Sequence, residues 1–403
     1  MSRRLRIPLV VGLTALLLGT LAWALREVYT QQYPGGNDLY PRWSAGCDWL
    51  TRGIDPYSES ATLEIQQGIY GRPAFEFEDQ VAFAYPIYSA AIIWPLCLTS
   101  DFATAHAVAM VALIAGVIGT AILSRQVSSW RPAGWLWVWA LFWIVVSYPS
   151  ARAVLLGQLA VMVGLVQVAA LEGLRTRRDV LAGIALAVSM VKPQMAILLV
   201  PGLLFWAVWT RRWQFVGAFT AAMAVLVLVP MAWLPSWIGD WIGQLRVYPS
   251  YTEFGSATWI LTTYYLGTPP LVELVLTAGL VVGVGYVWWV ARRARFEMMV
   301  WAAALTIVLT HFISPRTATT HFGPMLVPAF MMFRVTAQPE GRARPWAVAG
   351  FLAAVSVLSW VLFLLTVDGR QESALNYLPV PIGMLLALIW IRRPWLRLQG
   401  ASP

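Results

Sequence analysis

Hydrophobic residues run in long blocks along most of the chain, and the polar residues gather in short stretches between the blocks. The first block, IPLVVGLTALLLGTLAWAL at residues 7–25, is followed by others of similar character. A helix of about 20 apolar residues spans the hydrocarbon core of a bilayer, which is about 30 Å thick. The pattern therefore predicts an all-α, polytopic integral membrane protein. The first block follows the basic start MSRRLR and lacks a small-residue cleavage site, so we interpret it as a retained anchor.

Composition excludes a soluble globular protein. Hydrophobic residues make up 59% of the 403 positions and charged residues 12%, and the mean hydropathy is +0.66. No water-facing surface can be assembled from such a chain. The formal charge of +9 comes mainly from arginines at the ends of apolar blocks, which is the positive-inside pattern of membrane proteins. We therefore expect membrane lipids as neighbours and no nucleic-acid partner.

Clusters of arginine fix the predicted topology, because cytoplasmic loops carry the excess of basic residues. When every cluster is placed in the cytoplasm, both termini are cytoplasmic and about twelve helices cross the membrane. The clusters are Arg3/Arg4/Arg6, Arg125/Arg131, Arg175/Arg177/Arg178, Arg211/Arg212, Arg292/Arg293/Arg295, Arg334/Arg342/Arg344 and Arg392/Arg393/Arg397. The predicted helices lie near 7–26, 102–124, 133–149, 153–172, 180–191, 194–209, 213–233, 270–291, 297–313, 321–334, 345–367 and 376–391.

The largest predicted outer loop, residues 27–82, is the first extracytoplasmic loop. A loop of that length in a compact bundle is more often functional than connective. The next segment, residues 83–98, is apolar but short, and counting it as a crossing would move Arg125 and Arg131 outside, so we expect a half-inserted helix there. We expect residues 1–403 to form a single transmembrane domain. The loop carries nine of the 19 acidic residues: Glu27, Asp38, Asp48, Asp55, Glu59, Glu64, Glu76, Glu78 and Asp79.

The stretch SMVKPQM contains Lys192, the only lysine in the chain. An ammonium at membrane depth costs several kcal/mol unless it faces a cavity or a partner. The predicted topology aims Lys192 at the outer leaflet, and Pro193 ends the helix before it. The alternative is a lysine that only reaches for the interface. Because every other basic residue is arginine, we expect Lys192 to meet an anion.

Further donors are predicted at the same leaflet, and the turns that hold them lack a matching number of acids. A lipid phosphate suits such a cluster, because lysine binds phosphate as a point charge, arginine as a fork and histidine as a donor. For Arg316 and His321 an ordinary polar turn is the alternative, and for His311 a packing role is favoured. The donors are Arg152, Gln158, His311, Arg316 and His321.

Asp38 is the predicted catalytic base. It follows Gly35 and Gly36, which permit a tight turn after the first crossing, so its carboxylate is expected near the membrane surface. Residues 39–52 have the three- and four-residue spacing of an amphipathic helix, and Gly53 should end it. A carboxylate facing a bound sugar phosphate can take the proton of an attacking hydroxyl. The alternative role for Asp38 is an N-cap of that helix.

The sequence leaves the roles of two further features open. Cys47 and Cys97 lack metal-ligand spacing, and the sequence does not decide whether they pair. The acidic stretch FEFED at residues 75–79 could hold a divalent cation, but we favour a solvated acidic turn. For Asp48 and Asp55 we favour capping or turn roles.

The order of four motifs resembles glycosyltransferase family 87. The motifs are NDLYPRWSAGCDWLTRGIDPYS, FAYPIYSAAIIWPL, GQLAVMVGLVQ and GIALAVSMVKPQMAILL, and the resemblance covers roughly residues 1–330. Ile87 stands where the family more often has a second proline, which concerns the angle of the half-inserted helix. The resemblance implies a GT-C fold, a sugar donor on a polyprenyl phosphate, and an inverting transfer on the extracytoplasmic face. It also implies that Asp38 is catalytic and that His321, in SPRTATTHFGP, meets the donor phosphate.

The sequence thus predicts a multi-pass hexosyltransferase of the cell membrane, with mannose as the first choice of sugar. It would use a polyprenyl-phosphate sugar donor and a lipid or glycan acceptor, with Asp38 as base and Lys192, Arg316, His321, Arg152 and Gln158 at the phosphate. No cofactor is expected, and the absence of a DxD pair agrees with no metal. The rivals are a lipid-linked sugar flippase or transporter, and a surface polysaccharide polymerase or ligase. A transporter should place polar groups near the midplane rather than at the outer end.

Overall fold

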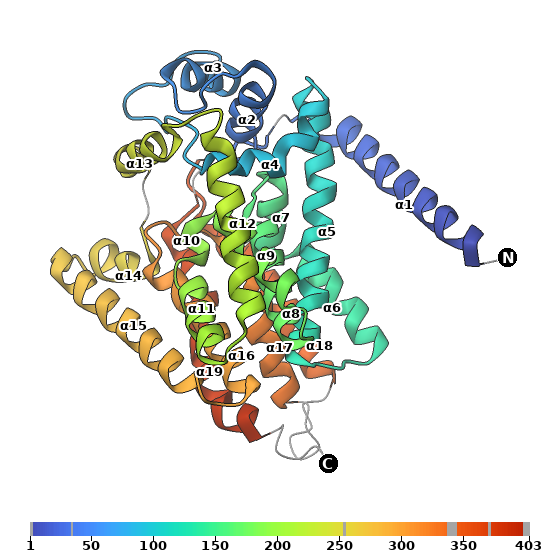
Figure 1. Cartoon of the computed structure of the whole chain (residues 1–403), viewed down its shortest axis with the longest axis vertical. Coiled ribbons are helices and arrows are strands. Elements are labelled where there is room, and N and C mark those ends of the chain that lie inside the picture. The colour runs from blue at the N-terminus through green and yellow to red at the C-terminus, as the bar shows by residue number, and fades with distance from the viewer. Residues whose placement is uncertain (1–2, 34, 253–254, 337–344, 370–371, 398–403) are drawn as a thin grey trace. The chain divides into compact units, whose positions relative to one another are not determined.

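The computed structural model describes residues 3–33, 35–252, 255–336, 345–369 and 372–397, with side chains from residue 12 onward. Every regular element in these ranges is helical, as Figure 1 shows, so the predicted all-α class is confirmed. The chain divides into two compact units. Unit 1 comprises residues 1–115, 154–159 and 230–252, and unit 2 comprises residues 116–153, 160–229 and 253–403. The predicted basic positions Arg3, Arg4, Arg6, Arg342 and Arg344 lie outside the described side chains.

Unit 1 holds the first predicted outer loop and the helices next to it. Its elements are α1 (Arg3–Leu25), η1 (Arg26–Thr30), α2 (Tyr40–Arg52), α3 (Glu59–Tyr70), η2 (Ile87–Ser89), α4 (Ala90–Ile93), η3 (Trp94–Leu98), the first half of α5 (Phe102–Ser128), α13 (Trp237–Val247) and η5 (Tyr248–Ser250). Helix α2 is the predicted amphipathic helix. It ends at Gly53, whose φ of 69° is the left-handed conformation that favours glycine, as expected.

A disulfide joins α2 to η3 in unit 1. Cys47 lies in α2 and Cys97 in η3, 50 positions later, so the pairing that the sequence left open is present. The indole Nε1 of Trp43 also donates a hydrogen bond to the carbonyl of Leu96 at 3.1 Å. A small core of Ala45, Ile65 and Phe83 fills the space between α2, α3 and the chain before η2. Helix α2 is therefore held by covalent, polar and apolar contacts.

Unit 2 contains most of the long helices. Its elements are α6 (Gly134–Val146), α7 (Tyr148–Leu155, most of it), α8 (Ala160–Arg175), α9 (Asp179–Val188), η4 (Ser189–Val191), α10 (Pro193–Ala196), α11 (Leu199–Trp209), α12 (Trp213–Met231), α14 (Ala257–Trp259), η6 (Ile260–Tyr265), α15 (Pro270–Ala291), α16 (Phe296–Ile313), η7 (Thr319–His321), η8 (Gly323–Met325), α17 (Leu326–Thr336), α18 (Pro345–Thr366), η9 (Ala374–Tyr377) and α19 (Pro379–Arg397).

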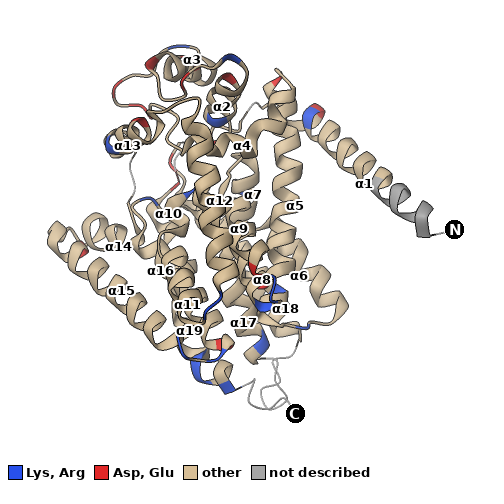
Figure 2. Cartoon of the chain, viewed as in Figure 1, with Lys and Arg blue, Asp and Glu red and all other residues tan. Residues whose placement is uncertain are grey.

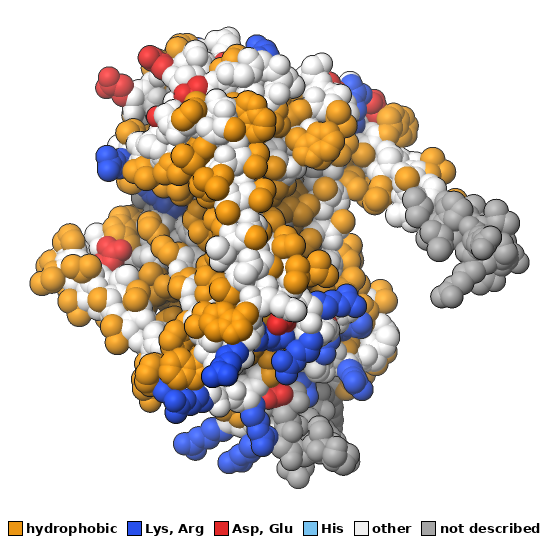
Figure 3. Space-filling model, viewed as in Figure 1, with side chains coloured by type: hydrophobic (Ala, Val, Ile, Leu, Met, Phe, Trp, Pro, Cys, Tyr) orange, Lys and Arg blue, Asp and Glu red, His pale blue; other side chains and the backbone are white. Residues whose placement is uncertain are grey.

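Helix α16 is the centre of unit 2. Its side chains are buried from Met298 to Phe312, and it packs against α15 and α19. Helices α12, α15 and α18 instead bury few of their apolar side chains inside the protein. On α15 five large side chains are more than 60% exposed: Leu271, Leu274, Val275, Val282 and Tyr286. Figure 3 shows the apolar surface that such side chains form. An apolar surface of this extent suits contact with lipid rather than water.

Basic side chains collect at one end of unit 2, as Figure 2 shows around the ends of α8, α17 and α19. Arg212 forms an ion pair with Asp179 and donates to the carbonyl of Leu174 at 2.9 Å, so the end of α8 and the starts of α9 and α12 meet there. Arg334 donates to the carbonyl of Ser128 at 3.0 Å, which joins the ends of α17 and α5. This segregation agrees with the positive-inside topology.

Six helices among the described residues are long and apolar enough to cross a membrane: α5, α12, α15, α16, α18 and the η9–α19 stretch. The pair α6 and α7, bent by 52°, would be a seventh. The chain therefore has the character of a multi-pass membrane protein. The predicted crossings at 180–191 and 194–209 fall on shorter helices, because the apolar sequence is interrupted at Lys192 and Pro193.

Candidate functional site

Asp38 lies in a tight turn directly before α2. Gly35 and Gly36 have φ values of 35° and 65°, and a Cβ on Gly36 would press on His106 and Phe102, so both glycines are required here. Helix α2 begins with Leu39 as its N-cap and has no side-chain cap hydrogen bond. The Asp38 carboxylate therefore does not cap α2, which was the alternative role. Its side chain is 35% exposed, enough to meet a substrate.

Arg42, one turn after Asp38, is the nearest charge to that carboxylate among the described residues. Its Nη2 lies 4.0 Å from Oδ1 of Asp38 and donates to the Tyr85 hydroxyl at 2.7 Å. The guanidinium lies over the Tyr85 ring, 4.0 Å from the centroid. The Tyr57 hydroxyl in turn donates to the Tyr85 carbonyl at 2.7 Å. Sequence reasoning did not select Arg42, because an arginine near a helix start carries no signal of its own.

The GQL motif, Gly157 to Leu159, lies against Leu39, the residue that follows Asp38. The amide of Leu39 donates to the carbonyl of Leu156 at 3.1 Å, within unit 1. Gly157 has a φ of 69°, and a Cβ there would overlap the Leu39 side chain. Gln158 follows and is buried. The motif therefore buttresses the Asp38 turn and brings Gln158 into the same unit as Asp38.

Lys192 lies in unit 2 at a break between two short helices. Helix α9 and η4 end before it, and α10 begins with Pro193 after it, as the sequence predicts. The backbone of Lys192 lies outside the helical region, with φ −127° and ψ 79°, and its side chain is only 3% exposed. A side chain buried to this degree agrees less with a lysine that only reaches for the interface than with one that contacts a polar partner.

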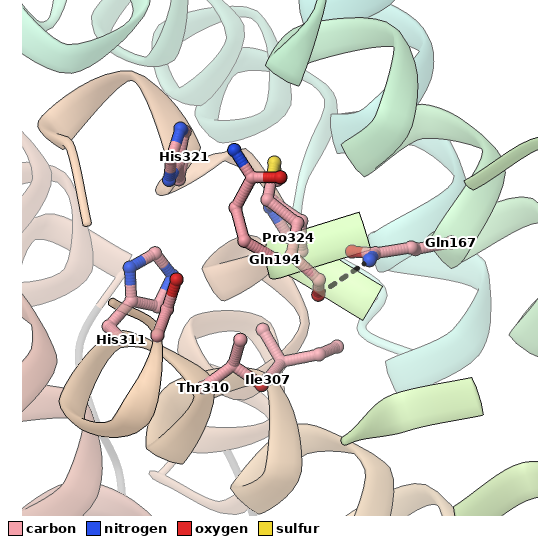
Figure 4. A pocket seen from close by; sticks show the side chains of 9 residues that line it. Gln167, Gln194, Ile307, Thr310, His311, His321 and Pro324 are labelled. Carbon is pink, nitrogen blue, oxygen red and sulfur yellow. Dashed lines mark hydrogen bonds between the residues drawn. The ribbon is translucent and has the colours of Figure 1, made fainter. Parts of the chain in front are cut away.

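The residues after Lys192 line a small polar cavity. Gln194, His311 and His321 project around it in Figure 4, and Gln167 donates to the carbonyl of Met195 at 2.9 Å beside it. The cavity volume is about 10 Å³, which holds about one water molecule. His311 makes a hydrogen bond with Thr317 at 3.0 Å, in line with the packing role favoured for it, and the rings of His311 and His321 lie 6.3 Å apart.

Arg152 is neutralised by an acid that sequence reasoning missed. Its Nη1 donates to Glu372, whose side chain is 1% exposed. The same carboxylate accepts from the Tyr148 hydroxyl at 2.9 Å and from the Thr319 hydroxyl at 2.7 Å. Thr319 also lies 3.5 Å from Arg152 and two residues before His321. The predicted excess of cations at this leaflet is therefore smaller than the sequence indicates.

The segment 314–321 links the predicted residues of unit 2. It contains Arg316, whose carbonyl accepts from Ser314 at 3.1 Å, and it contributes His321 to the cavity beside the Lys192 segment. It also contributes Thr319 to the Arg152 cluster. Lys192, Arg152, Arg316 and His321 thus all belong to unit 2, while Asp38 and Gln158 belong to unit 1.

Several other acids of the first loop have structural partners. Asp48 pairs with Arg52 at 2.6 Å, and Asp55 accepts from the amide of Tyr57 at 2.9 Å in the predicted turn. Glu78 pairs with Arg72 at 2.7 Å. The Arg72 hydrogen bond, assisted by the amide of Phe75, lowers the pKa of Glu78 to about 2. Asp38 differs from these acids in having only the distant Arg42 as an ion-pair partner among the described residues.

Comparison with known proteins places these features in a family. No curated protein and no solved structure matches the chain. The family model of glycosyltransferase family 87 matches residues 83–315, which is more than half of the chain. The matched range contains Arg152, Gln158 and Lys192, and it begins after Asp38 and ends before Arg316 and His321. The chain belongs to glycosyltransferase family 87.

Proposed function

We propose that this glycosyltransferase moves a hexose, with mannose as the first choice, from a polyprenyl-phosphate donor to an extracytoplasmic lipid or glycan acceptor. Asp38 is the general base. The residues that hold the departing phosphate are Lys192, Arg316 and His321, with Arg152 and Gln158 as second-rank members.

The reaction is an inverting displacement. The acceptor hydroxyl oxygen attacks the anomeric carbon while Asp38 takes its proton, and the bond between the anomeric carbon and the phosphate oxygen breaks. The electron pair of that bond leaves with the polyprenyl phosphate. Negative charge grows on the phosphate as the bond breaks, so cations already in place there stabilise the transition state more than the ground state. The general base contributes about 10² to 10⁴ in rate.

The observation that carries the proposal is the set of donor side chains around the segment 314–321. Lys192 and His321 are both buried, His321 lines the small cavity together with Gln194 and Met195 from the segment after Lys192, and Thr319 lies 3.5 Å from Arg152. Such a set at membrane depth suits a phosphate carried on a lipid. Glu372 neutralises Arg152, which agrees with its second rank, and Lys192, Arg316 and His321 are the first-rank phosphate ligands of this proposal.

An apolar cavity in unit 2 supports a lipid-borne donor. It has a volume of about 140 Å³ and is lined mainly by apolar side chains of α5, α6, α17, α18 and α19. Thr320, beside His321, and Ala153, beside Arg152, also line it. A prenyl chain could extend from the phosphate region into this cavity, because the cavity meets that region at these two residues.

We further propose that both units belong to one GT-C-like domain with about twelve crossings, in which shorter helices such as α8, α9 and α11 also span the bilayer. The reaction then takes place on the extracytoplasmic side of the cell membrane. The Cys47–Cys97 disulfide supports this side for the first loop, because disulfides persist in oxidising compartments and are rare in the cytosol.

Purified protein in lipid nanodiscs tests the proposal. Polyprenyl-phosphate mannose, and in a parallel sample GDP-mannose, is supplied with n-octyl α-D-mannopyranoside as acceptor. The proposal predicts transfer and release of polyprenyl phosphate from the lipid donor only. We expect Lys192→Gln to slow transfer strongly, whereas Arg178→Gln, which removes an exposed arginine at the start of α9, should not. A flippase would move intact donor between leaflets without releasing polyprenyl phosphate, and transfer from GDP-mannose alone would contradict the proposed donor.

A further inference from the structure

Arg42 carries buried hydrogen-bond donors that the protein does not satisfy. Its side chain is 7% exposed. Nη2 is occupied by the Tyr85 hydroxyl, but Nε and Nη1 have no hydrogen-bond partner among the described residues. A buried charged donor without an acceptor costs more than the 1–3 kcal/mol typical of a neutral one. Native proteins rarely leave such groups unpaired, and a bound ligand is one of the few explanations.

The contacts that Arg42 makes do not supply a hydrogen-bond acceptor for its Nε and Nη1 groups. The Tyr85 ring covers the face of the guanidinium, whereas the unpaired N–H groups lie in its plane. The Asp38 carboxylate at 4.0 Å is beyond hydrogen-bond distance. Burial raises the pKa of Tyr248 well above its usual range, and Arg42 partly offsets that rise, so this phenol also lies within electrostatic reach of Arg42. Among the described residues, the side chains of Tyr85, Tyr248 and Asp38 lie near the guanidinium, and none of them accepts a hydrogen bond from Nε or Nη1.

If the proposed function holds, the position of Arg42 favours a contact with the acceptor substrate over a contact with the sugar donor. In an inverting displacement the base and the leaving phosphate lie on opposite sides of the anomeric carbon. Arg42 is one helical turn from the base and 4.0 Å from its carboxylate. A group bound by Arg42 therefore lies on the side of the anomeric carbon from which the acceptor hydroxyl attacks. Donor phosphate would have its ligands elsewhere, at Lys192 and His321.

We propose that Arg42 binds an anionic group, a phosphate or a carboxylate, on the acceptor substrate, and so makes the enzyme selective for anionic acceptors. The disulfide, the Trp43–Leu96 hydrogen bond and the Leu39–Leu156 hydrogen bond hold α2 in place. The guanidinium is therefore presented by a rigid element next to the base. Arginine suits this role because its planar fork matches phosphate and carboxylate oxygens.

The test is a binding experiment that does not need turnover. The wild-type protein is titrated with n-octyl α-D-mannopyranoside 6-phosphate and with neutral n-octyl α-D-mannopyranoside, and tryptophan fluorescence is recorded. The wild type should bind the phosphorylated probe more tightly. Arg42→Gln should weaken that binding at least about ten-fold and leave the neutral probe unaffected, and Arg42→Lys should restore part of it. Arg52→Gln, on the same helix but paired with Asp48, is the matched control.

Two outcomes would overturn the proposal. One is a wild type that binds both probes equally. The other is phosphorylated-probe binding that survives Arg42→Gln but is lost in Lys192→Gln, because the anion would then occupy the proposed donor site. An intact Cys47–Cys97 disulfide and an unchanged melting temperature show that Arg42→Gln is folded. Since transfer is not measured, a failure of the proposed reaction would leave this result standing.

Discussion

The carboxylate of Glu372 forms an ion pair with the guanidinium of Arg152, 220 positions earlier in the chain. Tyr148 and Thr319 donate to the same carboxylate, so every polar group of the cluster depends on it. The pair ties the chain before η9 to α7 and to the segment that carries His321. Glu372 thus positions residues of the proposed phosphate region without itself being a phosphate ligand.

Removal of Glu372 should destabilise unit 2. Glu372→Ala leaves Arg152 largely buried and without its counter-charge, which typically costs about 3–5 kcal/mol. We expect a lowered melting temperature in detergent, measured by tryptophan fluorescence. Arg152→Met combined with Glu372→Leu should recover most of the loss, because no unpaired charge then remains. A melting temperature that Glu372→Ala leaves unchanged would show that the ion pair does not stabilise the protein.

Gly157→Ala should reduce transfer far more than Gly71→Ala. Both glycines have φ near 70°, so alanine costs about 1 kcal/mol of backbone strain at either position. A Cβ at 157 also overlaps Leu39 beside Asp38, whereas a Cβ at 71 meets nothing within 4 Å. The transfer rates of the two variants, normalised to folded protein, measure the difference. Equal rates would mean that the GQL motif does not support the Asp38 turn.

Cys47 and Cys97 should resist thiol reagents in intact cells. They are the chain's only two cysteines, so a maleimide–polyethylene glycol label should add no mass before reduction and two units after reduction and denaturation. The double variant Cys47→Ser with Cys97→Ser should lose about 2–4 kcal/mol of stability, because the disulfide restricts the unfolded chain. Labelling without reduction would contradict the pairing and its support for an extracytoplasmic loop.

The carboxyl group of Glu78 should have a pKa far below that of an ordinary glutamate. Its pKa falls from 4.5 to about 2, first because of the hydrogen bond from Arg72. Since the folded pKa is lower than the unfolded one, the pair stabilises the loop above about pH 4.5, and this contribution is lost as pH falls through about 2. Carbon-13 NMR of labelled glutamate measures the pKa, and Arg72→Gln should raise it towards 4.5. An unchanged titration in that variant would remove Arg72 as the cause.

Local sequence signals predicted the short-range structure well. The spacing of residues 39–52 and the glycine at 53 located α2 and its end, and Pro193 located the break after Lys192. Helix length was harder, because an apolar block looks continuous even where a backbone break divides it. The blocks at 180–191 and 194–209 became α9 with η4, α10 and α11 for this reason.

Long-range pairings could not be predicted from these signals. Glu372 lies in a short polar stretch with no motif, and only the folded chain brings it to Arg152. The orphan donors of Arg42 likewise follow from its burial beside Tyr85, 43 positions later. The family match contributes the reaction class, but it begins at residue 83, so the role of Asp38 rests on its own surroundings.

The transfer rate of Asp38→Asn tests the central claim most directly. With polyprenyl-phosphate mannose and n-octyl α-D-mannopyranoside, Asp38→Asn should lower the rate by about 10² to 10⁴ while donor binding is retained. Asp48→Asn, an acid in α2 that pairs with Arg52, should transfer at nearly the wild-type rate. Full transfer by Asp38→Asn would contradict the assignment of this carboxylate as the base.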